Sequence, residues 1–338
     1  MLTANDLEFV ILAAGKSTRN YPHSKGIPHK SLIPLGSRKV IDHIISEMIS
    51  CGAKHITIVC SDDKAKEAFE LCFTKEKKIE DKFRKNGNII GLELLQSVYV
   101  PDDVEIKYVI QHEPKGLGHA IGLANKVACG RHLVVRMPDD VVIPNHCATD
   151  LELRKSVVRR CVEKYIADGK GGNMFITRHV GDPSRWGIID DGVFKEKPKE
   201  SKSDEAFHTL AIFDAKVAKR LEQVADAVDT VGTVEYELWC GEGKEIHFDK
   251  YLNDEVQKDP EVMAIRTFPI ADTDTYLDCG TIQGYEQALL YTLLKESVFK
   301  DRNKEIAKVL LIDCLLEDGN VGRQSLGEMA EQRMGSGK

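Results

Sequence analysis

Short apolar runs rich in β-branched residues alternate with amphipathic stretches along most of the chain. This alternation predicts strands joined by helical crossovers. It favours an α/β fold with a doubly wound, mainly parallel, Rossmann-like sheet and helices on both faces. Strands are predicted over 9–14, 55–60, 105–111, 132–137, 173–180, 210–213 and 263–269, and helices over 40–49, 63–73, 116–128, 151–167, 215–224, 282–297 and 304–316.

Three segments depart from this alternation of strands and helices. The charged runs at 74–88 and 195–205 are typical of solvated loops or faces. The polar stretch over 225–260 has no clear period, and we assign no element to it.

The composition narrows the class of protein. The 338 residues are 42% hydrophobic, which is enough for a large buried core and argues against disorder. The formal net charge of -7 argues against a nucleic-acid or anionic-membrane binder, because those partners favour a basic surface. The N-terminal apolar run over 9–14 is too short for a signal peptide or a membrane span. The nine cysteines form no C-x-x-C pair, so we expect reduced thiols in a cytoplasmic protein.

Gly15-Lys16-Ser17 invites comparison with a P-loop, but the surrounding sequence excludes one. Val10 occupies the position of the required first glycine, and two prolines follow where a helix should begin. The G-x-G-x-x-G fingerprint is also missing after the first strand, which argues against an NAD-binding dehydrogenase.

A long basic loop remains after the first predicted strand. Ligands of open α/β sheets bind at the carboxyl ends of the strands, where this loop lies. Small residues at Ala13, Ala14 and Gly15 let a ligand approach the backbone, and cations neutralise phosphates. The cations of the loop are Lys16, Arg19, Lys25, Lys30 and Arg38.

The loop resembles the signature of the sugar-1-phosphate nucleotidylyltransferases, A-G-x-G-T-R followed by K-x-x-P-K-x-x-L-P. The resemblance implies that Arg19 and Lys30 are catalytic and hold a nucleoside triphosphate, with Ala13, Ala14, Gly15 and Lys30 in the nucleotide site. Two departures stand out, because Ser17 replaces a glycine and one extra residue separates proline from Lys30. The matching residues are Ala14-Gly15, Thr18-Arg19, Lys25 and Lys30-Ser-Leu-Ile-Pro34.

A second segment, from Gln111 to Ala120, joins a strand end to a helix start, where backbone N–H groups are free. Taken alone, it is equally typical of a tight turn. It is similar to the Gln...Lys-Gly-Leu-Gly-His-Ala segment of the bacterial UTP:glucose-1-phosphate uridylyltransferases, which implies that Gln111 and Gly116 bind the uracil base.

Two acidic residues, Asp139 and Asp140, follow the strand predicted over 132–137. Carboxylates at such a position suit Mg2+, which also binds nucleotide phosphates. In the family resemblance, Asp278 of Leu-Asp-Cys-Gly-Thr is the second metal carboxylate and Asp139 the first. Each acid can equally cap a helix or stabilise a turn, and the role of Asp140 stays open.

The sugar side of the site is suggested by a third resemblance. Phe194-Lys-Glu-Lys-Pro198 resembles the family's V-E-K-P motif, which implies that Glu196 binds sugar hydroxyls and Lys197 the sugar phosphate, with Lys197 also catalytic. Gly187, after Trp186, is similar to a turn that lets the backbone approach the hexose. A family glycine that follows this motif is missing here, with Thr209 in its place, and either Glu237 or Glu245 corresponds to a later acidic motif.

Together these motifs imply a Mg2+-assisted enzyme that converts UTP and glucose 1-phosphate to UDP-glucose and pyrophosphate. Two alternatives remain: the same chemistry with another nucleotide or sugar, such as a dTTP:glucose-1-phosphate thymidylyltransferase, or a non-catalytic sugar-nucleotide regulator. The resemblance implies one domain over 1–300, with a nucleotide part at about 7–150 and a sugar part at about 170–280. A C-terminal helix and frayed tail would follow over 301–338. We expect a homo-oligomer, a dimer or tetramer, without nucleic-acid or membrane partners.

Overall fold

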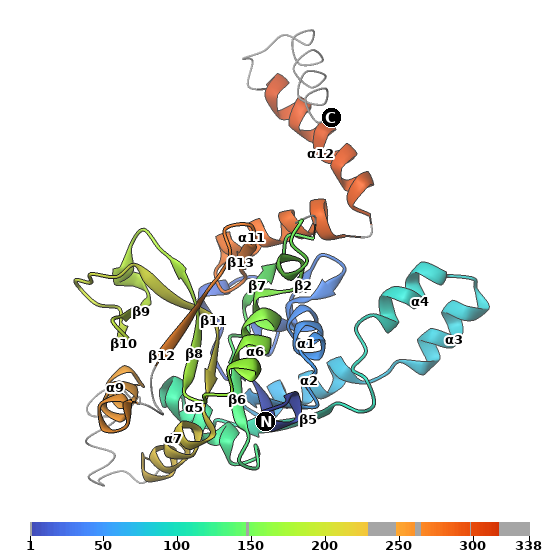
Figure 1. Cartoon of the computed structure of the whole chain (residues 1–338). Coiled ribbons are helices and arrows are strands. Elements are labelled where there is room, and N and C mark those ends of the chain that lie inside the picture. Colours follow the sequence, from blue (N-terminus) through green and yellow to red (C-terminus); the bar gives the residue numbers. More distant parts are fainter. Residues whose placement is uncertain (1, 147–148, 229–247, 261–264, 298, 318–338) are drawn as a thin grey trace.

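The computed structural model describes residues 2–146, 149–228, 248–260, 265–297 and 299–317. A nine-stranded mixed sheet crosses the molecule in the order β10-β9-β11-β6-β1-β4-β5, and β8 and β12 join it through β11 (Figure 1). The strands β1, β4, β5 and β6 are parallel. The bounds are β1 Leu7–Ala13, β4 His55–Cys60, β5 Glu105–Ile110, β6 His132–Arg136, β8 Asn173–His179, β9 Gly187–Asp190, β10 Val193–Glu196, β11 Glu205–Phe213 and β12 Ile265–Pro269.

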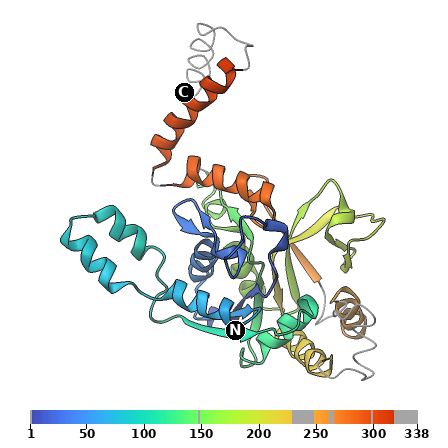
Figure 2. The ribbon, with the colours of Figure 1, turned by 180° about the vertical axis from the view of Figure 1, so that it is seen from behind.

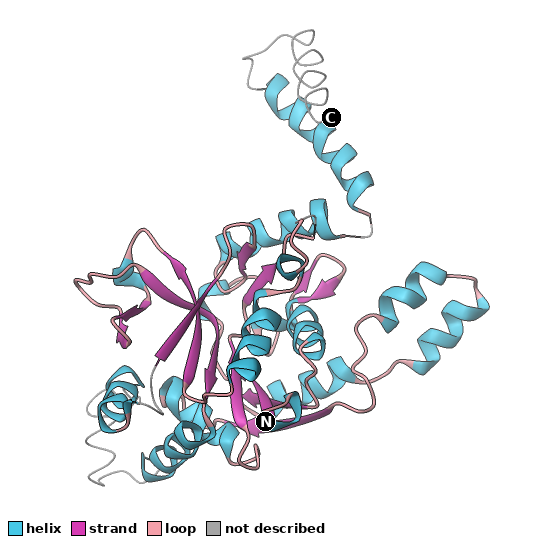
Figure 3. Ribbon diagram, in the orientation of Figure 1, coloured by secondary structure: helices cyan, strands magenta, loops and turns pink. Residues whose placement is uncertain are grey.

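Helices cover both faces of this sheet, as Figure 3 shows. In β1, Phe9 and Ile11 point into one apolar cluster, and Val10 and Leu12 point into the other. A strand buried on both faces in this way has no polar side, which explains its continuous apolar sequence and confirms the predicted doubly wound α/β fold. The helices α1 Val40–Ser50, α2 Asp63–Phe73 and α6 Val157–Asp168 contribute to the first cluster, and α5 Gly116–Asn125, α7 Ala215–Val228 and α9 Phe248–Lys258 to the second.

The charged run at 74–88, predicted to be a solvated loop or face, is mostly helical and largely exposed, so it forms a solvated helix face. It contains α3 Lys77–Lys85, and α4 Ile89–Gln96 begins directly after it. Lys, Glu and Arg are good helix formers, and a helix exposed on most of its surface keeps them solvated. Figure 2 shows the α3–α4 pair extending away from the sheet.

Several short strands were not predicted because two to four residues carry no measurable period. They are β2 Pro34–Leu35, β3 Arg38–Lys39, β7 Asp140–Ile143 and β13 Thr275–Asp278, together with β9 and β10 of the main sheet. Two helices follow β13, α11 Ile282–Tyr291 and α12 Lys300–Glu317, and α12 leads away from the body (Figure 1). None of the helices in the described part of the chain is long and apolar enough to cross a lipid bilayer.

The topology brings distant segments to one edge of the sheet. Because β11 is antiparallel to both β6 and β8, these two strands run in the same direction as β1. The carboxyl ends of β1, β6 and β8 therefore share an edge. The basic loop follows β1 there, the Asp139 turn follows β6, and β13 pairs with β7 beside them.

Candidate active site

Lys30 is presented by a short 3-10 turn, Lys30–Leu32, that His29 caps. The Nδ1 atom of His29 accepts a hydrogen bond from the backbone N–H of Ser31 at 3.2 Å. Burial, and then the charge of Lys30, lowers the pKa of His29 to about 4, so its ring is neutral at pH 7. His29 is the extra residue of the loop, and the structure accommodates it by burying it completely.

Ser17 has a left-handed backbone conformation, which is unusual for a residue other than glycine. Its φ of 56° lies in the left-handed region, which costs a residue with a Cβ atom more than it costs glycine. The Ser17 Oγ atom accepts a hydrogen bond from the backbone N–H of Lys30 at 3.1 Å. Ser17 therefore connects the two halves of the loop.

The small residues before Ser17 differ in their surroundings. Ala13 buries its methyl group in the core, Ala14 is half-buried and Gly15 is exposed. A Cβ atom on Gly15 would meet no atom within 4 Å, so there is open space beside this backbone.

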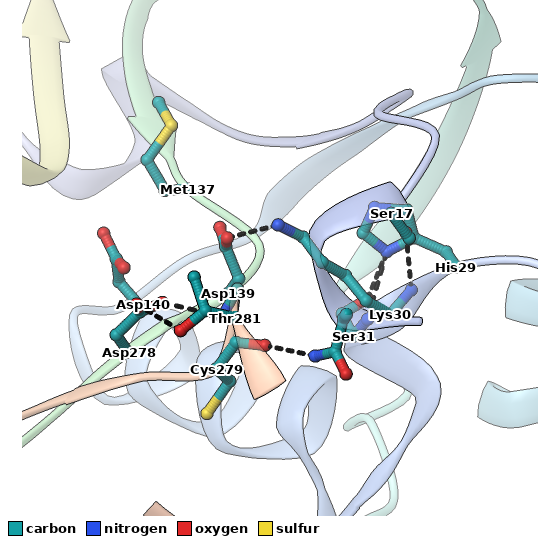
Figure 4. Close-up of polar contacts among 12 residues, drawn as sticks. Ser17, His29, Lys30, Ser31, Met137, Asp139, Asp140, Asp278, Cys279 and Thr281 are labelled. Carbon is teal, nitrogen blue, oxygen red and sulfur yellow. Dashed lines mark hydrogen bonds and ion pairs between the residues drawn. The ribbon is translucent and has the colours of Figure 1, made fainter. Parts of the chain in front are cut away.

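The predicted phosphate-binding lysine and the predicted metal carboxylates come together. The Nζ atom of Lys30 forms an ion pair with Asp139, and both side chains are largely buried (Figure 4). The Asn20 side chain donates a hydrogen bond to the carbonyl of Cys279 at 2.8 Å, which ties the basic loop to the turn containing Asp278.

Gly280 explains how the two carboxylates approach. A Cβ atom at this position would lie 2.2 Å from Asp139 Oδ2 and 3.0 Å from Asp278 Oδ1. Both oxygens thus lie within 3.0 Å of one point, and only glycine leaves that point free. Asp278 is held in place by hydrogen bonds from the Gly280 N–H at 2.7 Å and the Thr281 hydroxyl at 3.1 Å.

This pair of carboxylates fits a magnesium ion. Magnesium keeps several waters and takes one or two protein carboxylates together with substrate phosphates. Among the described residues, no group of three or more His, Cys, Asp or Glu side chains could hold a metal. Two carboxylates would hold such an ion only together with water and with phosphate oxygens of a substrate.

Asp140 has a different environment from its neighbour. Its carboxylate accepts hydrogen bonds from the Tyr276 hydroxyl at 2.7 Å and from the Thr209 N–H at 3.1 Å. Burial, and then the Asp139 charge, raises the pKa of Asp140 to about 6. Both oxygens are occupied, so Asp140 connects β7 to β13 and β11. Thr209 has a φ of 68°, in the left-handed region that favours glycine.

A buried arginine, Arg136, stabilises the turn after β6. Arg136 is 1% exposed and forms an ion pair with Glu47 of α1, Nη2 to Oε2 at 3.1 Å. It also donates to the carbonyls of Met137, Thr209 and Asp140. Sequence analysis missed this pair. Two signals were available: Glu47 lies in an amphipathic helix beside apolar residues, and Arg136 lies within an apolar strand.

A pocket of about 560 Å³ opens beside Asp278. Arg19 lines it, as the sequence predicts for a phosphate-binding residue. Arg178 and Arg185 also line it, and sequence analysis did not identify them, although Arg178 lies one residue before the end of β8, at the edge of the sheet where ligands bind. Six of its lining residues matter for the chemistry: Arg19, Arg178, Arg185, Trp186, Tyr276 and Asp278.

The predicted base-binding residues contact each other. The Gln111 Nε2 atom donates to the carbonyl of Gly116 at 3.2 Å and lies 3.0 Å from His119 Nδ1. Gly116 begins α5 with a φ of 86°, which only glycine adopts without strain. The Gln111 side chain is consequently fixed in orientation.

The predicted sugar-binding residues lie on a separate hairpin. Glu196 pairs with Gly187 across β10 and β9, and the Glu196 carboxylate forms an ion pair with Lys197 at 3.1 Å. Glu196 and Lys197 are exposed and do not line the pocket that holds Arg19 and Asp278. A Cβ atom on Gly187 would lie 2.5 Å from the Phe194 ring, so packing already requires glycine there. Glu237 and Glu245 lie outside the described residues.

The fold places this lysine, the arginines and the carboxylates at the carboxyl ends of parallel strands, which is where α/β proteins bind nucleotides. The family model for nucleotidyl transferase matches residues 8–292, and the chain belongs to this family. The predicted membership of the nucleotidyltransferases, and the enzyme class, are confirmed.

Curated relatives and solved structures agree with this assignment. The chain is 26% identical over 324 residues to a UTP--glucose-1-phosphate uridylyltransferase of Haemophilus ducreyi, covering 90% of this chain and 100% of the relative. It is 30% identical over 203 residues to a UTP--glucose-1-phosphate uridylyltransferase of Staphylococcus epidermidis, covering 56% of this chain and 65% of the relative. The fold is similar to a UDP-glucose pyrophosphorylase from Acinetobacter baumannii, with a TM-score of 0.68 at 20% identity over 90% of this chain and 99% of that one. A UTP-bound UGPase from the same organism has a TM-score of 0.67 at 20% identity, covering 89% of this chain and 98% of that one.

Proposed function

We propose that this protein transfers a uridylyl group from UTP to glucose 1-phosphate, giving UDP-glucose and pyrophosphate. The convergence of Lys30, Asp139 and Asp278 beside a pocket lined by Arg19 carries the proposal. The names of the curated relatives support the same substrates.

The attacking group in this reaction is a phosphate oxygen that is already anionic at neutral pH. No general base or covalent intermediate is needed, and the protein must instead hold two polyanions in line and offset their charge. Arg19 and Lys30 bind the triphosphate, with the backbone at Ala13, Ala14 and Gly15 beside it. Lys197 binds the sugar phosphate, and Glu196 and Gly187 the hexose.

Asp139 and Asp278 hold Mg2+ in this proposal. When bound, the ion would supply positive charge that offsets the charge of the phosphates. Lys30 would have to leave Asp139 for the aspartate to hold the ion, and its ammonium group would then be free to bind phosphate.

The orientation of Gln111 supports a preference for uracil over cytosine. Its Nε2 atom already donates to Gly116 and faces His119, so the Oε1 atom remains to accept a hydrogen bond. Uracil offers an N3–H donor at its pairing edge, whereas cytosine offers an acceptor there. A mismatched base would leave buried polar groups unpaired, so CTP should be a poor substrate.

A substrate panel tests the proposal. Pyrophosphate release is measured with UTP, dTTP or CTP against several hexose 1-phosphates, with Mg2+ and with a chelator. We expect UTP with glucose 1-phosphate to turn over fastest and only with Mg2+. Faster turnover with dTTP would assign a thymidylyltransferase, and UTP binding without turnover would assign a regulator.

We further propose that residues 1–300 form the transferase domain, which the family match over 8–292 supports, and that α12 continues beyond it from residue 301. The predicted tail lies outside the described residues. We also propose a cytoplasmic homo-oligomer, a dimer or tetramer. Light scattering of the purified protein and fractionation of cells measure these two properties.

A further inference from the structure

Arg178 lines the pocket and forms no ion pair with any residue that the structure describes. Its guanidinium carbon lies 4.6 Å from the centre of the Tyr276 ring. Its Nε atom is buried and has no hydrogen-bond partner among the residues that the structure describes. No carboxylate among the described residues forms an ion pair with it. A buried donor without a partner is costly, which points to a ligand that satisfies it.

The support beneath Arg178 is rigid. The Tyr276 hydroxyl donates to Asp140 at 2.7 Å, which fixes the ring. The His208 ring packs against Tyr276 with centroids 5.0 Å apart, and the Trp186 ring lies 4.5 Å from His208. An arginine stacked on an aromatic ring keeps its planar fork of donors in one orientation.

The pocket is lined by more arginines than the proposed reaction assigns a role to. Arg19, Arg178 and Arg185 line it, and none of them forms an ion pair with a described residue. Asp278 is the only carboxylate among its described lining residues, and its oxygens already accept hydrogen bonds from Gly280 and Thr281. Arg19 is assigned to the triphosphate. Arg178 and Arg185 remain, and unpaired guanidinium groups in one cavity repel each other unless an anion lies between them.

We propose that Arg178, assisted by the exposed Arg185, binds an anionic oxygen group of the acceptor sugar. Arginine matches phosphate and carboxylate groups with two parallel hydrogen bonds, so either group suits the site. The identity of the ligand as the acceptor rests on the proposed function, whereas the anion site itself rests on the pocket. Two sources of the anion are possible: the 1-phosphate that every acceptor carries, or a carboxylate on the hexose ring, as in a uronic acid 1-phosphate.

The test compares two acceptors, glucose 1-phosphate and glucuronic acid 1-phosphate, with UTP in excess. The KM of each acceptor and of UTP is measured for the wild type, Arg178→Gln and Arg178→Lys. Loss of a charge-assisted hydrogen bond costs about 10- to 100-fold in affinity, so Arg178→Gln should raise the acceptor KM by at least about 10-fold. The KM of UTP should change by less than about twofold, and Arg178→Lys should recover part of the loss.

The pattern over the two acceptors identifies the anion. An increase for both acceptors assigns Arg178 to the 1-phosphate. An increase for the uronic acid alone assigns it to the carboxylate and makes acidic hexoses substrates. Acceptor KM values within twofold of the wild type for both compounds overturn the proposal.

Two controls keep the result interpretable. Arg185→Gln changes an exposed side chain, so it tests the pocket without disturbing the core, and it should raise the same KM by a smaller factor. Arg302→Gln removes an exposed arginine on α12, outside the pocket lining, and should leave every KM unchanged.

An inactive wild type would refute the proposed function but not the anion site. In that case binding of inorganic phosphate is measured by calorimetry for the wild type and Arg178→Gln. Weaker binding by the variant supports an anion site at Arg178, and equal binding by the two proteins overturns it.

Discussion

Lys30 and Asp139 form a largely buried ion pair although they lie 109 residues apart. In the proposed reaction these residues bind opposite charges, the lysine a phosphate and the aspartate a metal. Each therefore neutralises the other until substrate and ion arrive together. The pair keeps both charges in a partly desolvated site, where a single unpaired charge would be costly.

We predict that Lys30→Gln lowers kcat strongly. The variant removes a positive charge from the leaving phosphates, and removal of one such group typically costs about 100- to 1,000-fold. Pyrophosphate release measures the effect. Lys54→Gln is the matched control, because Lys54 precedes β4 at the opposite end of the strands and should change kcat by less than twofold. Equal activities of the two variants would remove Lys30 from the mechanism.

For the carboxylates, we predict that Asp278→Asn weakens the dependence of activity on Mg2+ more than it weakens UTP binding. The amide keeps the size of the side chain but loses the charge that attracts a hard cation. Activity is measured over a Mg2+ titration, and UTP affinity by calorimetry. If Asp139→Ala and Asp278→Ala released pyrophosphate at the wild-type rate, the metal assignment would be wrong.

Arg19→Lys tests whether the loop arginine binds phosphate with its planar fork. Lysine keeps the charge but cannot form two parallel hydrogen bonds. We expect turnover to fall by more than about tenfold, equivalent to about 1.4 kcal/mol of transition-state stabilisation. Turnover equal to that of the wild type would show that charge alone suffices.

The Glu47–Arg136 pair predicts a large effect on stability from a site outside the pocket. Glu47→Gln leaves the Arg136 charge buried without its counterion, and burial already raises the pKa of Glu47. Breaking a buried pair in this way costs about 3 kcal/mol or more. Urea unfolding measures it, and Glu163→Gln, in an exposed pair with Arg159, should cost under about 1 kcal/mol. A similarly small cost for both variants would contradict the structural role.

His208 predicts a pH dependence of stability with a definite sign. Burial lowers the pKa of His208 to about 3, well below the 6.5 of an unfolded chain. The unfolded state therefore binds the proton first, so this stability is present above pH 6.5 and is lost as the pH falls. Between pH 7 and pH 5 the loss is about 2 kcal/mol.

The variant His208→Phe removes this titration and keeps a ring against Trp186 and Tyr276. Its free energy of unfolding should fall less between pH 7 and pH 5 than that of the wild type. Substitution of the exposed His112 by Phe should retain the wild-type pH dependence. An unchanged pH dependence in His208→Phe would mean that this ring does not stay neutral in the folded protein.

The sequence by itself determined the class of fold and most of the residues proposed for the site. Burial on both faces makes a central parallel strand continuously apolar, as in Phe9 to Ala13, so the doubly wound sheet can be predicted from local pattern. Ligands bind at strand ends, and therefore the motifs at Arg19, Gln111 and Asp139 could be located without a structure.

Only the tertiary structure decided how these residues meet. The ion pair of Lys30 with Asp139, the buried pair of Glu47 with Arg136 and the stacking of Arg178 on Tyr276 all join segments that are far apart in the chain. No local period encodes such contacts, because they depend on which strand ends share an edge of the sheet. The left-handed backbone at Ser17 and Thr209 is likewise imposed by the surrounding packing, since neither residue favours it alone.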